Sequence, residues 1–463
     1  MPLPRPDAVQ LAVHELSAVI HTHPMFPDAA GMRRRTADKA SKLAEQPIPR
    51  LAVATLLVCI HLLMLVAAGH SRIHEPFNNS PNEAPYYTNP NATVLGGYPR
   101  QPVHWSRLVA SRWDAEVYIS FAIRGLSACP KTKAPGYLYM HCGLAWFPAY
   151  GLLGGKVAWI FHLPPDIALM LISILSAILV NYFWTSKLIA DRIGKPAAWL
   201  TLFAFNAYPS AFYMVAPYTE ALTLALAFGG FWLMSKDRWV GAAALIGAAS
   251  GLRGTALAFS GAFGLAALVA CASRRKAGDA RWWRPLASTP LAVWGLVATF
   301  AMFQVKVGDA LAYVHARKAF GDFHDFGRFV SPIFYLRGFT AQHMDSVMMF
   351  GMLGLILLAG RPLLRKFTRE QATFLIATGA IGMALVIPTV HEYWGINRYL
   401  LTCPLGFLAA GHIARRYPWV FALWIVLCVW MYWHIELCSY VAHGNPHFCP
   451  CLGRIEWEAP FAS

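Results

Sequence analysis

Charged residues are scarce in this chain. They make up 13% of its 463 residues, roughly half the share found in soluble domains. Hydrophobic residues make up 57% and lie in long blocks, such as residues 167–184 and 417–433. Helical blocks of about 20 apolar residues match the roughly 30 Å hydrocarbon core of a bilayer. The scarcity of charge therefore excludes a series of soluble domains and predicts a polytopic protein within the lipid bilayer.

Acidic residues are scarcer still, with 23 Asp and Glu against 39 Lys and Arg and a net charge of +16. Such an excess can indicate a nucleic-acid partner. Here the basic residues form short clusters between apolar blocks, as in the cytoplasmic loops of membrane proteins, and no basic groove with interleaved aromatic residues is seen. We therefore expect no nucleic-acid partner. The clusters span residues 187–195, 235–238, 273–284, 361–370 and 414–416.

Several motifs are missing. The sequence has no P-loop, no GxGxxG stretch after a strand, no strand periodicity and no obvious internal repeat. Its nine cysteines lack the spacing of a zinc site, because Cys449 and Cys451 are too close for a CxxC pair. No metal site is predicted from them. Disulfides stay open for Cys129 and Cys142 in the first outer loop, and for Cys438, Cys449 and Cys451 in the tail.

The predicted fold is an all-α bundle of about 11 transmembrane helices. The apolar run at 51–68 begins too late for a typical signal peptide, so we interpret it as a signal-anchor helix. Residues 1–50 form a cytoplasmic extension, 51–436 the transmembrane domain and 437–463 an outer-face tail. The expected spans are 51–68, 167–187, 196–215, 219–234, 239–253, 256–272, 288–306, 346–360, 372–390, 399–414 and 418–435.

The loop charges predict an orientation. The five basic clusters hold sixteen Lys and Arg, whereas the short opposite loops hold only Arg253 and Arg398. The basic clusters are therefore expected inside, and the long loops 69–166 and 307–345 outside. Residues 144–163 are apolar enough to span, but spanning would invert every later loop. We expect an interfacial helix there, with the spanning alternative still open.

The stretch SRWDAEVY, residues 111–118, places charges in the first outer loop. On a helix, Arg112 and Glu116 are four residues apart and can pair. Asp114 is then left without a local cation, between Trp113 and the next-turn Tyr118. A carboxylate in this position suits a general base for a sugar hydroxyl. The alternative is a solvated interfacial helix anchored by Trp113.

Glu220 and Arg253 are two further candidates. Glu220 follows Tyr218 in APYTEAL at the outer end of a helix, where an acid also simply favours the helix dipole. Arg253 lies in GLRGTA between apolar blocks, and an arginine so placed is usually functional or tightly paired. Both residues are predicted to face the same outer pocket as Asp114.

A last polar group lies in HEYWGINRYLL, residues 391–401. Arg398 begins a helix and is a candidate phosphate clamp, since a guanidinium can grip a phosphate with two hydrogen bonds. Snorkelling toward the interface is the alternative. The neighbouring binding candidates are His391, Glu392 and Asn397. Together with Arg112, Trp113, Tyr118, Tyr218 and Arg253, these residues predict an acceptor- and donor-binding pocket at the lipid surface.

Five motifs in this order resemble the PIG-V-like mannosyltransferases, the GPI mannosyltransferase 2 family of the GT-C superfamily. They are RWDAEVYISFAIRG with LAWFPAYGLL, FNAYPSAFYMVAPYTEALTLAL, GLRGTALA, GDALAYVHARKAFGD and NRYLL. The resemblance runs from about residue 107 to 405. It implies a GT-C-type bundle with interfacial helices in the first outer loop.

The resemblance also implies an inverting glycosyltransferase. The donor would be a polyprenyl-phosphate sugar of the dolichyl-phosphate-mannose type, and the acceptor a lipid-linked or glycan hydroxyl at the lumenal or periplasmic face. Asp114 takes the role of the base, Glu220 is the PYTE acid and Arg398 is the RYLL arginine. Glu116, next to Asp114 in the same stretch, is a further catalytic candidate that no family motif assigns. The compact loops favour a bacterial plasma membrane, or the endoplasmic reticulum in a eukaryote.

Two questions stay open at this level. No cofactor is required by the implied mechanism, but Asp114, Glu116 and Glu220 would suit a divalent metal ion. A lipid-linked-sugar transporter or flippase is the alternative function, although its polar groups would be expected near the bilayer midplane on repeated halves. A catalytically inactive scaffold with the same fold is a third interpretation.

Overall fold

A computed structural model describes residues 47–73, 114–126, 143–319, 325–337, 344–388 and 396–437. The chain divides into two units, Met1–Val53 and Ala54–Ser463, and the second carries nearly all of the described structure. The described residues are 83% helical and contain no strand. This content confirms the predicted all-α class.

Within the described residues, six segments are long and apolar enough to cross a bilayer, consistent with a multi-pass membrane protein. They are Ile48–Ala68, Pro165–Ile193, Gly254–Lys276, Arg284–Val307, Asp345–Leu364 and Pro418–Glu436. The predicted count of eleven is therefore not confirmed: three further apolar helices, Glu220–Ser235, Trp239–Ser250 and Pro404–Ala414, are shorter than 18 residues, and two predicted spans are divided. Proline contributes to two divisions: Pro209 opens a 3-10 turn after α11 (Lys195–Ala207), and Pro404 starts α22 (Pro404–Ala414) after a break.

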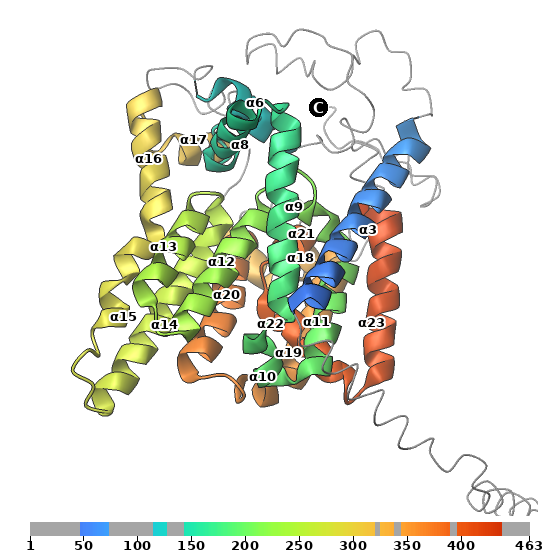
Figure 1. The fold of residues 1–463 in the computed structure, drawn as a ribbon, viewed down its shortest axis with the longest axis vertical. Coiled ribbons are helices and arrows are strands. Elements are labelled where there is room, and N and C mark those ends of the chain that lie inside the picture. Colours follow the sequence, from blue (N-terminus) through green and yellow to red (C-terminus); the bar gives the residue numbers. More distant parts are fainter. Residues whose placement is uncertain are drawn as a thin grey trace, which may run out of the picture. The chain divides into compact units, whose positions relative to one another are not determined.

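Helices that run away from the end where α6 (Asp114–Arg124) and α8 (Ala149–Phe161) lie alternate with helices that return to it (Figure 1). The first group comprises α9 (Pro165–Trp184), α12 (Glu220–Ser235), α14 (Leu257–Lys276), α19 (Asp345–Leu364) and α22. The second comprises α11, α13 (Trp239–Ser250), α16 (Trp294–Val307), α20 (Arg369–Val386) and α23 (Pro418–Met431). The long helix α3 (Pro47–Ile73), which contains the first candidate span, precedes both groups. The connecting elements are α10 (Lys187–Ile193), η3 (Gly254–Ala256), α15 (Arg284–Ala287), η4 (Thr289–Val293) and α21 (Ile396–Leu400).

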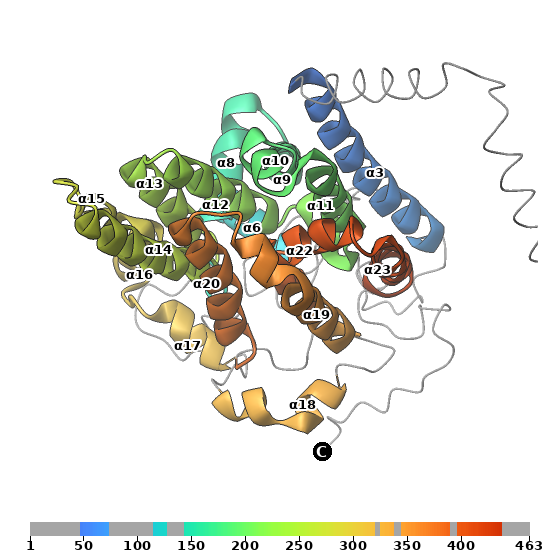
Figure 2. The ribbon, with the colours of Figure 1, turned by 90° about the horizontal axis from the view of Figure 1, so that it is seen from below.

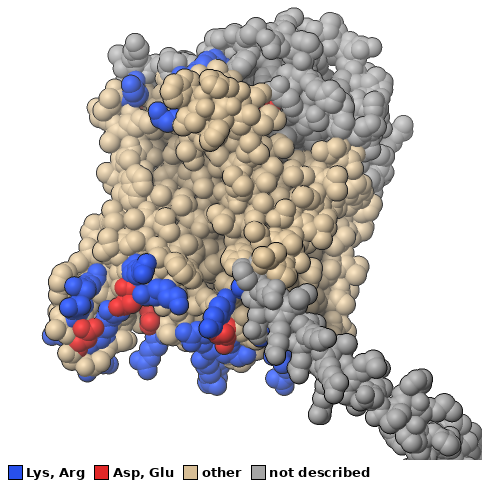
Figure 3. Space-filling view, viewed as in Figure 1, with Lys and Arg blue, Asp and Glu red and all other residues tan. Residues whose placement is uncertain are grey.

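All five basic clusters lie at one end of these helices, in helix ends, in the short helix α10 and in the turns between helices; we call this the basic end. In Figure 3 lysines and arginines gather at this end, below a broad band of surface with almost no charge. A belt without charge between two polar ends is typical of a protein that crosses a bilayer. We call the opposite end, where α6 and α8 lie, the site end.

The expected interfacial helix is α8. Its 13 residues span about 20 Å, less than the hydrocarbon core. It packs against α6 and α9 through glycines. A Cβ added to Gly151 would lie 2.6 Å from the Tyr118 carbonyl oxygen of α6, and one added to Gly155 would lie 2.3 Å from the Ala122 carbonyl oxygen. The other face exposes Trp159 and Phe161. This close approach fixes α6, and with it Asp114, over the site end.

In the interior, α22 lies among α11, α19 and α20 when viewed along the bundle from the basic end (Figure 2). The longest side-by-side pairing is that of α14 with α20. Further elements follow α16: α17 (Ala312–Ala319), η5 (Phe326–Val330) and α18 (Pro332–Arg337). The π-helical turn η6 (Tyr432–Glu436) ends α23. At the site end, α21 packs against α19 and η2 (Pro209–Met214), and η6 also packs against η2.

Candidate functional site

Four charged side chains from four separate segments meet at the site end; we call them the four-charge cluster. Asp114 and Glu220 are the first residues of α6 and α12, Arg253 precedes η3, and Arg398 lies in α21. Arg398 is the centre of the cluster. Its Nε donates to Oε1 of Glu220, and its Nη1 donates to Oδ2 of Asp114 at 2.6 Å. The cluster thus joins residues 284 positions apart in the sequence.

Arg253 completes the cluster from the other side of Glu220. Its Nη1 lies 2.7 Å from Oε1 of Glu220. The N–H groups are not aligned for a hydrogen bond, so the contact is an ion pair. Two carboxylates and two guanidinium groups make the cluster formally neutral. Pairing of this kind is what allows charges to be buried, since an unpaired buried charge is strongly destabilising.

The four side chains differ in their exposure. Glu220 is fully buried, the Arg253 and Arg398 side chains are 8% and 14% exposed, and Asp114 is 25% exposed. Oε2 of Glu220 is buried and has no hydrogen-bond partner among the described residues. Glu220 is therefore the anchor of the cluster, and Asp114 is the carboxylate that a ligand can reach.

Aromatic rings hold the two guanidinium groups. The Arg398 Cζ lies 4.6 Å from the Tyr218 ring centroid and 5.1 Å from that of Tyr213. The Arg253 Cζ lies 5.2 Å from the Tyr399 ring centroid. Cation–π contacts of this kind orient a guanidinium plane and stabilise its charge. The sequence analysis singled out Tyr218, but not Tyr213 or Tyr399, although both lie within the motifs that carry the resemblance.

Tyr118 lies in the buried core beneath the cluster, with its ring edge-to-face against Tyr150 at 5.2 Å. The Tyr150 hydroxyl donates to the Leu169 carbonyl oxygen at 2.8 Å and lies 2.7 Å from Oγ of Ser173. Ser173 in turn donates to the Tyr218 carbonyl oxygen at 3.1 Å. Burial, and then the Asp114 carboxylate, raise the pKa of Tyr118, so its phenol stays protonated. Tyr118 supports the cluster from below.

Asn397, one of the predicted binding residues, lies in a buried hydrogen-bond network beside the cluster. Its side chain donates to Oε1 of Glu436 at 2.8 Å and lies 3.5 Å from the Tyr208 hydroxyl, which donates to it. Its backbone N–H donates to Oδ1 of Asp345 at 2.9 Å. The side chain is fully buried. These bonds tie α21 to α19 and η6, and so help to position the neighbouring Arg398.

From the sequence, Asp114 has no local cation; the structure adds a distant one. Its partner is Arg398, which is remote in sequence and reaches Asp114 only through the packing of the bundle. Arg398 is likewise not a bare cation but is bound to two carboxylates. Arg253 is tightly paired with Glu220.

Other candidates cannot be placed. Arg112, Trp113, His391 and Glu392 lie outside the described residues, as do Cys129, Cys142, Cys438, Cys449 and Cys451. Glu116 lies on α6, but its side chain and the proposed pair with Arg112 are outside the described part. Among the described residues, no group of three or more His, Cys, Asp or Glu could hold a metal ion.

No family model matches the chain, and neither a curated protein nor a solved structure matches it. The case for a function therefore depends on the cluster itself and on the motifs that contain its residues.

Proposed function

We propose that this protein is an inverting membrane glycosyltransferase with the eleven-span GT-C architecture. It transfers a sugar, mannose by the resemblance, from a polyprenyl-phosphate donor to a hydroxyl of a lipid-linked or glycan acceptor. One observation supports the proposal above the others. Asp114, Glu220 and Arg398, to which the resemblance assigns roles, lie in three distant segments and form one connected ion-paired cluster.

The charge balance of the cluster assigns the roles. A donor phosphate adds negative charge to a site that is formally neutral, so it must compete with a carboxylate for a guanidinium. Asp114 is the carboxylate to be displaced, because it is the more exposed and has one arginine partner within the described part of the chain, whereas Glu220 is buried between two. Guanidinium–phosphate pairs are strong because two N–H groups can bond two oxygens. Donor binding to Arg398 thus releases Asp114.

The released Asp114 carboxylate is the general base. The acceptor O–H gives its proton to Asp114 while the oxygen attacks the anomeric carbon from the face opposite the phosphate. The bond between the anomeric carbon and the phosphate oxygen breaks, and its electron pair stays on the phosphate. Arg398 and Arg253 stabilise the charge of this leaving group. No proton donor is needed for the leaving phosphate, and no metal ion is required in this scheme.

The proposal is tested with membranes that contain the full chain. They are incubated with a radiolabelled polyprenyl-phosphate mannose, and the glycolipid and glycan fractions are extracted. We expect label in a new product and inversion at the anomeric carbon. Membranes without the protein serve as the control. Movement of the labelled donor across the membrane with no labelled product would instead identify a transporter. If neither a labelled product nor donor movement is observed, the protein is a scaffold without either activity.

A further inference from the structure

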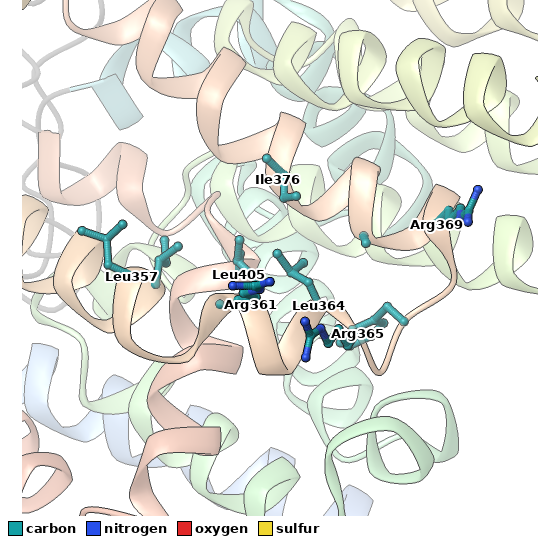
Figure 4. A pocket seen from close by; sticks show the side chains of 11 residues that line it. Leu357, Arg361, Leu364, Arg365, Arg369, Ile376 and Leu405 are labelled. Atoms are coloured by element: carbon teal, nitrogen blue, oxygen red, sulfur yellow. The ribbon is translucent and has the colours of Figure 1, made fainter.

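A groove opens between α19 and α20 near the basic end, with a volume of about 730 Å³. Both helices pack against α22, which contributes Leu405 to the lining (Figure 4). Most of the wall is apolar: the lining includes Ile356, Leu357, Gly360, Leu364, Phe367, Ala372, Ile376 and Leu405. The groove is at the end opposite the four-charge cluster, so the proposed sugar transfer does not use it.

Three arginines form the rim of this groove. Arg361 and Arg365 come from the end of α19 and the turn after it, and Arg369 is the first residue of α20. All three are exposed, and within the described part of the chain none of them has an acidic partner. Glu370, adjacent in sequence, makes no ion pair with them. Three unpaired positive charges beside an apolar wall favour a ligand of opposite charge.

Further positive charge lies in the same turn. Lys366 follows Arg365, and Nη1 of Arg192 donates to the Lys366 carbonyl oxygen at 3.2 Å. The local field at the rim is therefore strongly positive, and an ammonium group would be repelled there. Close to a membrane surface, each additional Lys or Arg strengthens the binding of anionic lipid by about 1 kcal/mol.

The apolar part of the groove has the length of a partly buried acyl chain. Leu357 lies eight residues before Arg365 on α19, and Ile376 lies seven after Arg369 on α20. At 1.5 Å per helical residue the apolar wall extends about 10–12 Å from the charged rim. One leaflet of the hydrocarbon core is roughly 15 Å thick. The wall therefore lies at the depth of acyl chains while the arginines lie at the depth of headgroups.

We propose that this groove binds an anionic glycerophospholipid, with its phosphate on Arg361, Arg365 and Arg369 and one acyl chain between α19 and α20. The charges complement the headgroup, and the apolar wall complements the chain. A zwitterionic lipid of the same chain length binds less well, because its headgroup brings an ammonium toward three guanidinium groups.

The test uses the purified full chain in detergent, titrated with phosphatidylglycerol or with phosphatidylcholine of the same acyl chains. Native mass spectrometry counts bound lipid, and thermal unfolding reports the stabilisation that binding produces. We expect tight binding of phosphatidylglycerol with a raised Tm, and at least about ten-fold weaker binding of phosphatidylcholine. Soluble glycerol phosphate at the same concentration should not raise the Tm, since it lacks the chain.

Two variants separate the charged rim from the apolar wall. Replacing Arg361, Arg365 and Arg369 by Ala should weaken phosphatidylglycerol binding about 100-fold, at roughly five-fold for each charge. Ala372→Trp fills the groove and keeps the arginines, and should also abolish the tight binding. The matched control replaces Lys276, Arg281 and Arg284 by Ala, which removes the same charge from exposed positions elsewhere at the basic end. Its affinity should change by less than about three-fold.

Equal loss in the control triple variant would show a general surface-charge effect and overturn the proposal. So would equal affinity for the two lipids, or unchanged phosphatidylglycerol binding in Ala372→Trp. Because the readouts are lipid binding and Tm, the result does not depend on the proposed transfer activity.

Discussion

Replacing Arg398 by Lys tests its role as the donor clamp. Arg398 now bonds Glu220 through Nε and Asp114 through Nη1, so it presents two N–H groups in fixed directions. Lysine keeps the charge but has one ammonium, which cannot reproduce this fork. We expect the protein to fold, because Glu220 still has Arg253 and the new lysine beside it.

The magnitude is set by the bonds lost. A hydrogen bond to a charged group contributes about 1.5–3 kcal/mol, and the lysine forfeits one such bond to the donor phosphate. At 1.4 kcal/mol per factor of ten, donor affinity should fall roughly 10- to 100-fold. Arg398→Ala is less informative, because it removes the arginine that pairs with Asp114 and one of the two arginines that pair with buried Glu220. Breaking a buried ion pair in this way costs about 3–5 kcal/mol in stability.

The assay is the donor concentration dependence of initial transfer rates, with thermal unfolding to confirm folding. Arg253→Lys is the matched control, since Arg253 contacts Glu220 but not Asp114. We expect the control to weaken donor affinity several-fold less than Arg398→Lys. A folded Arg398→Lys protein with wild-type donor affinity would refute the assignment of Arg398 as the clamp.

Three further predictions concern topology and support of the site. In a background without native cysteines, Asp191→Cys should be labelled only from the cytoplasm and Leu311→Cys only from outside; the reverse pattern would contradict the orientation. Gly155→Leu should displace α6, because even a Cβ would meet the Ala122 carbonyl oxygen at 2.3 Å; we expect at least about ten-fold lower kcat, and an unchanged rate would refute the role of this contact. Asn397→Asp places a third carboxylate beside Asp345 and Glu436, so the expression level should fall or the Tm should drop by several degrees. A variant with wild-type expression and Tm would show that this network does not hold α21.

Local sequence patterns were enough to predict most helices and the basic end. Apolar blocks and basic turns are properties of short stretches, so α9, α14 and α19 fall where the sequence placed them. The division of 196–215 and of 399–414 into two pieces each depends on how Pro209 and Pro404 pack. For this reason the predicted count of eleven spans is not confirmed.

The candidate site could be predicted residue by residue, but not as a set of partners. Asp114, Glu220, Arg253 and Arg398 are each unusual in an apolar chain, and this made them visible. Their pairing depends on the packing of α6, α12 and α21, because the partners lie 178 and 284 positions from Arg398. The partners of Asn397 could not be predicted for the same reason, since Asp345 and Glu436 come from other helices.

The most direct test of the account is Asp114→Asn, measured for both turnover and donor binding. Asparagine keeps the shape of the side chain but cannot accept the acceptor proton, and loss of a positioned base lowers the rate by about 100- to 10,000-fold. It also removes the carboxylate that competes for Nη1 of Arg398. We therefore predict that turnover collapses while donor binding is retained or becomes tighter. Wild-type turnover in a folded Asp114→Asn protein, or a loss of donor binding equal to the loss of turnover, would contradict the account.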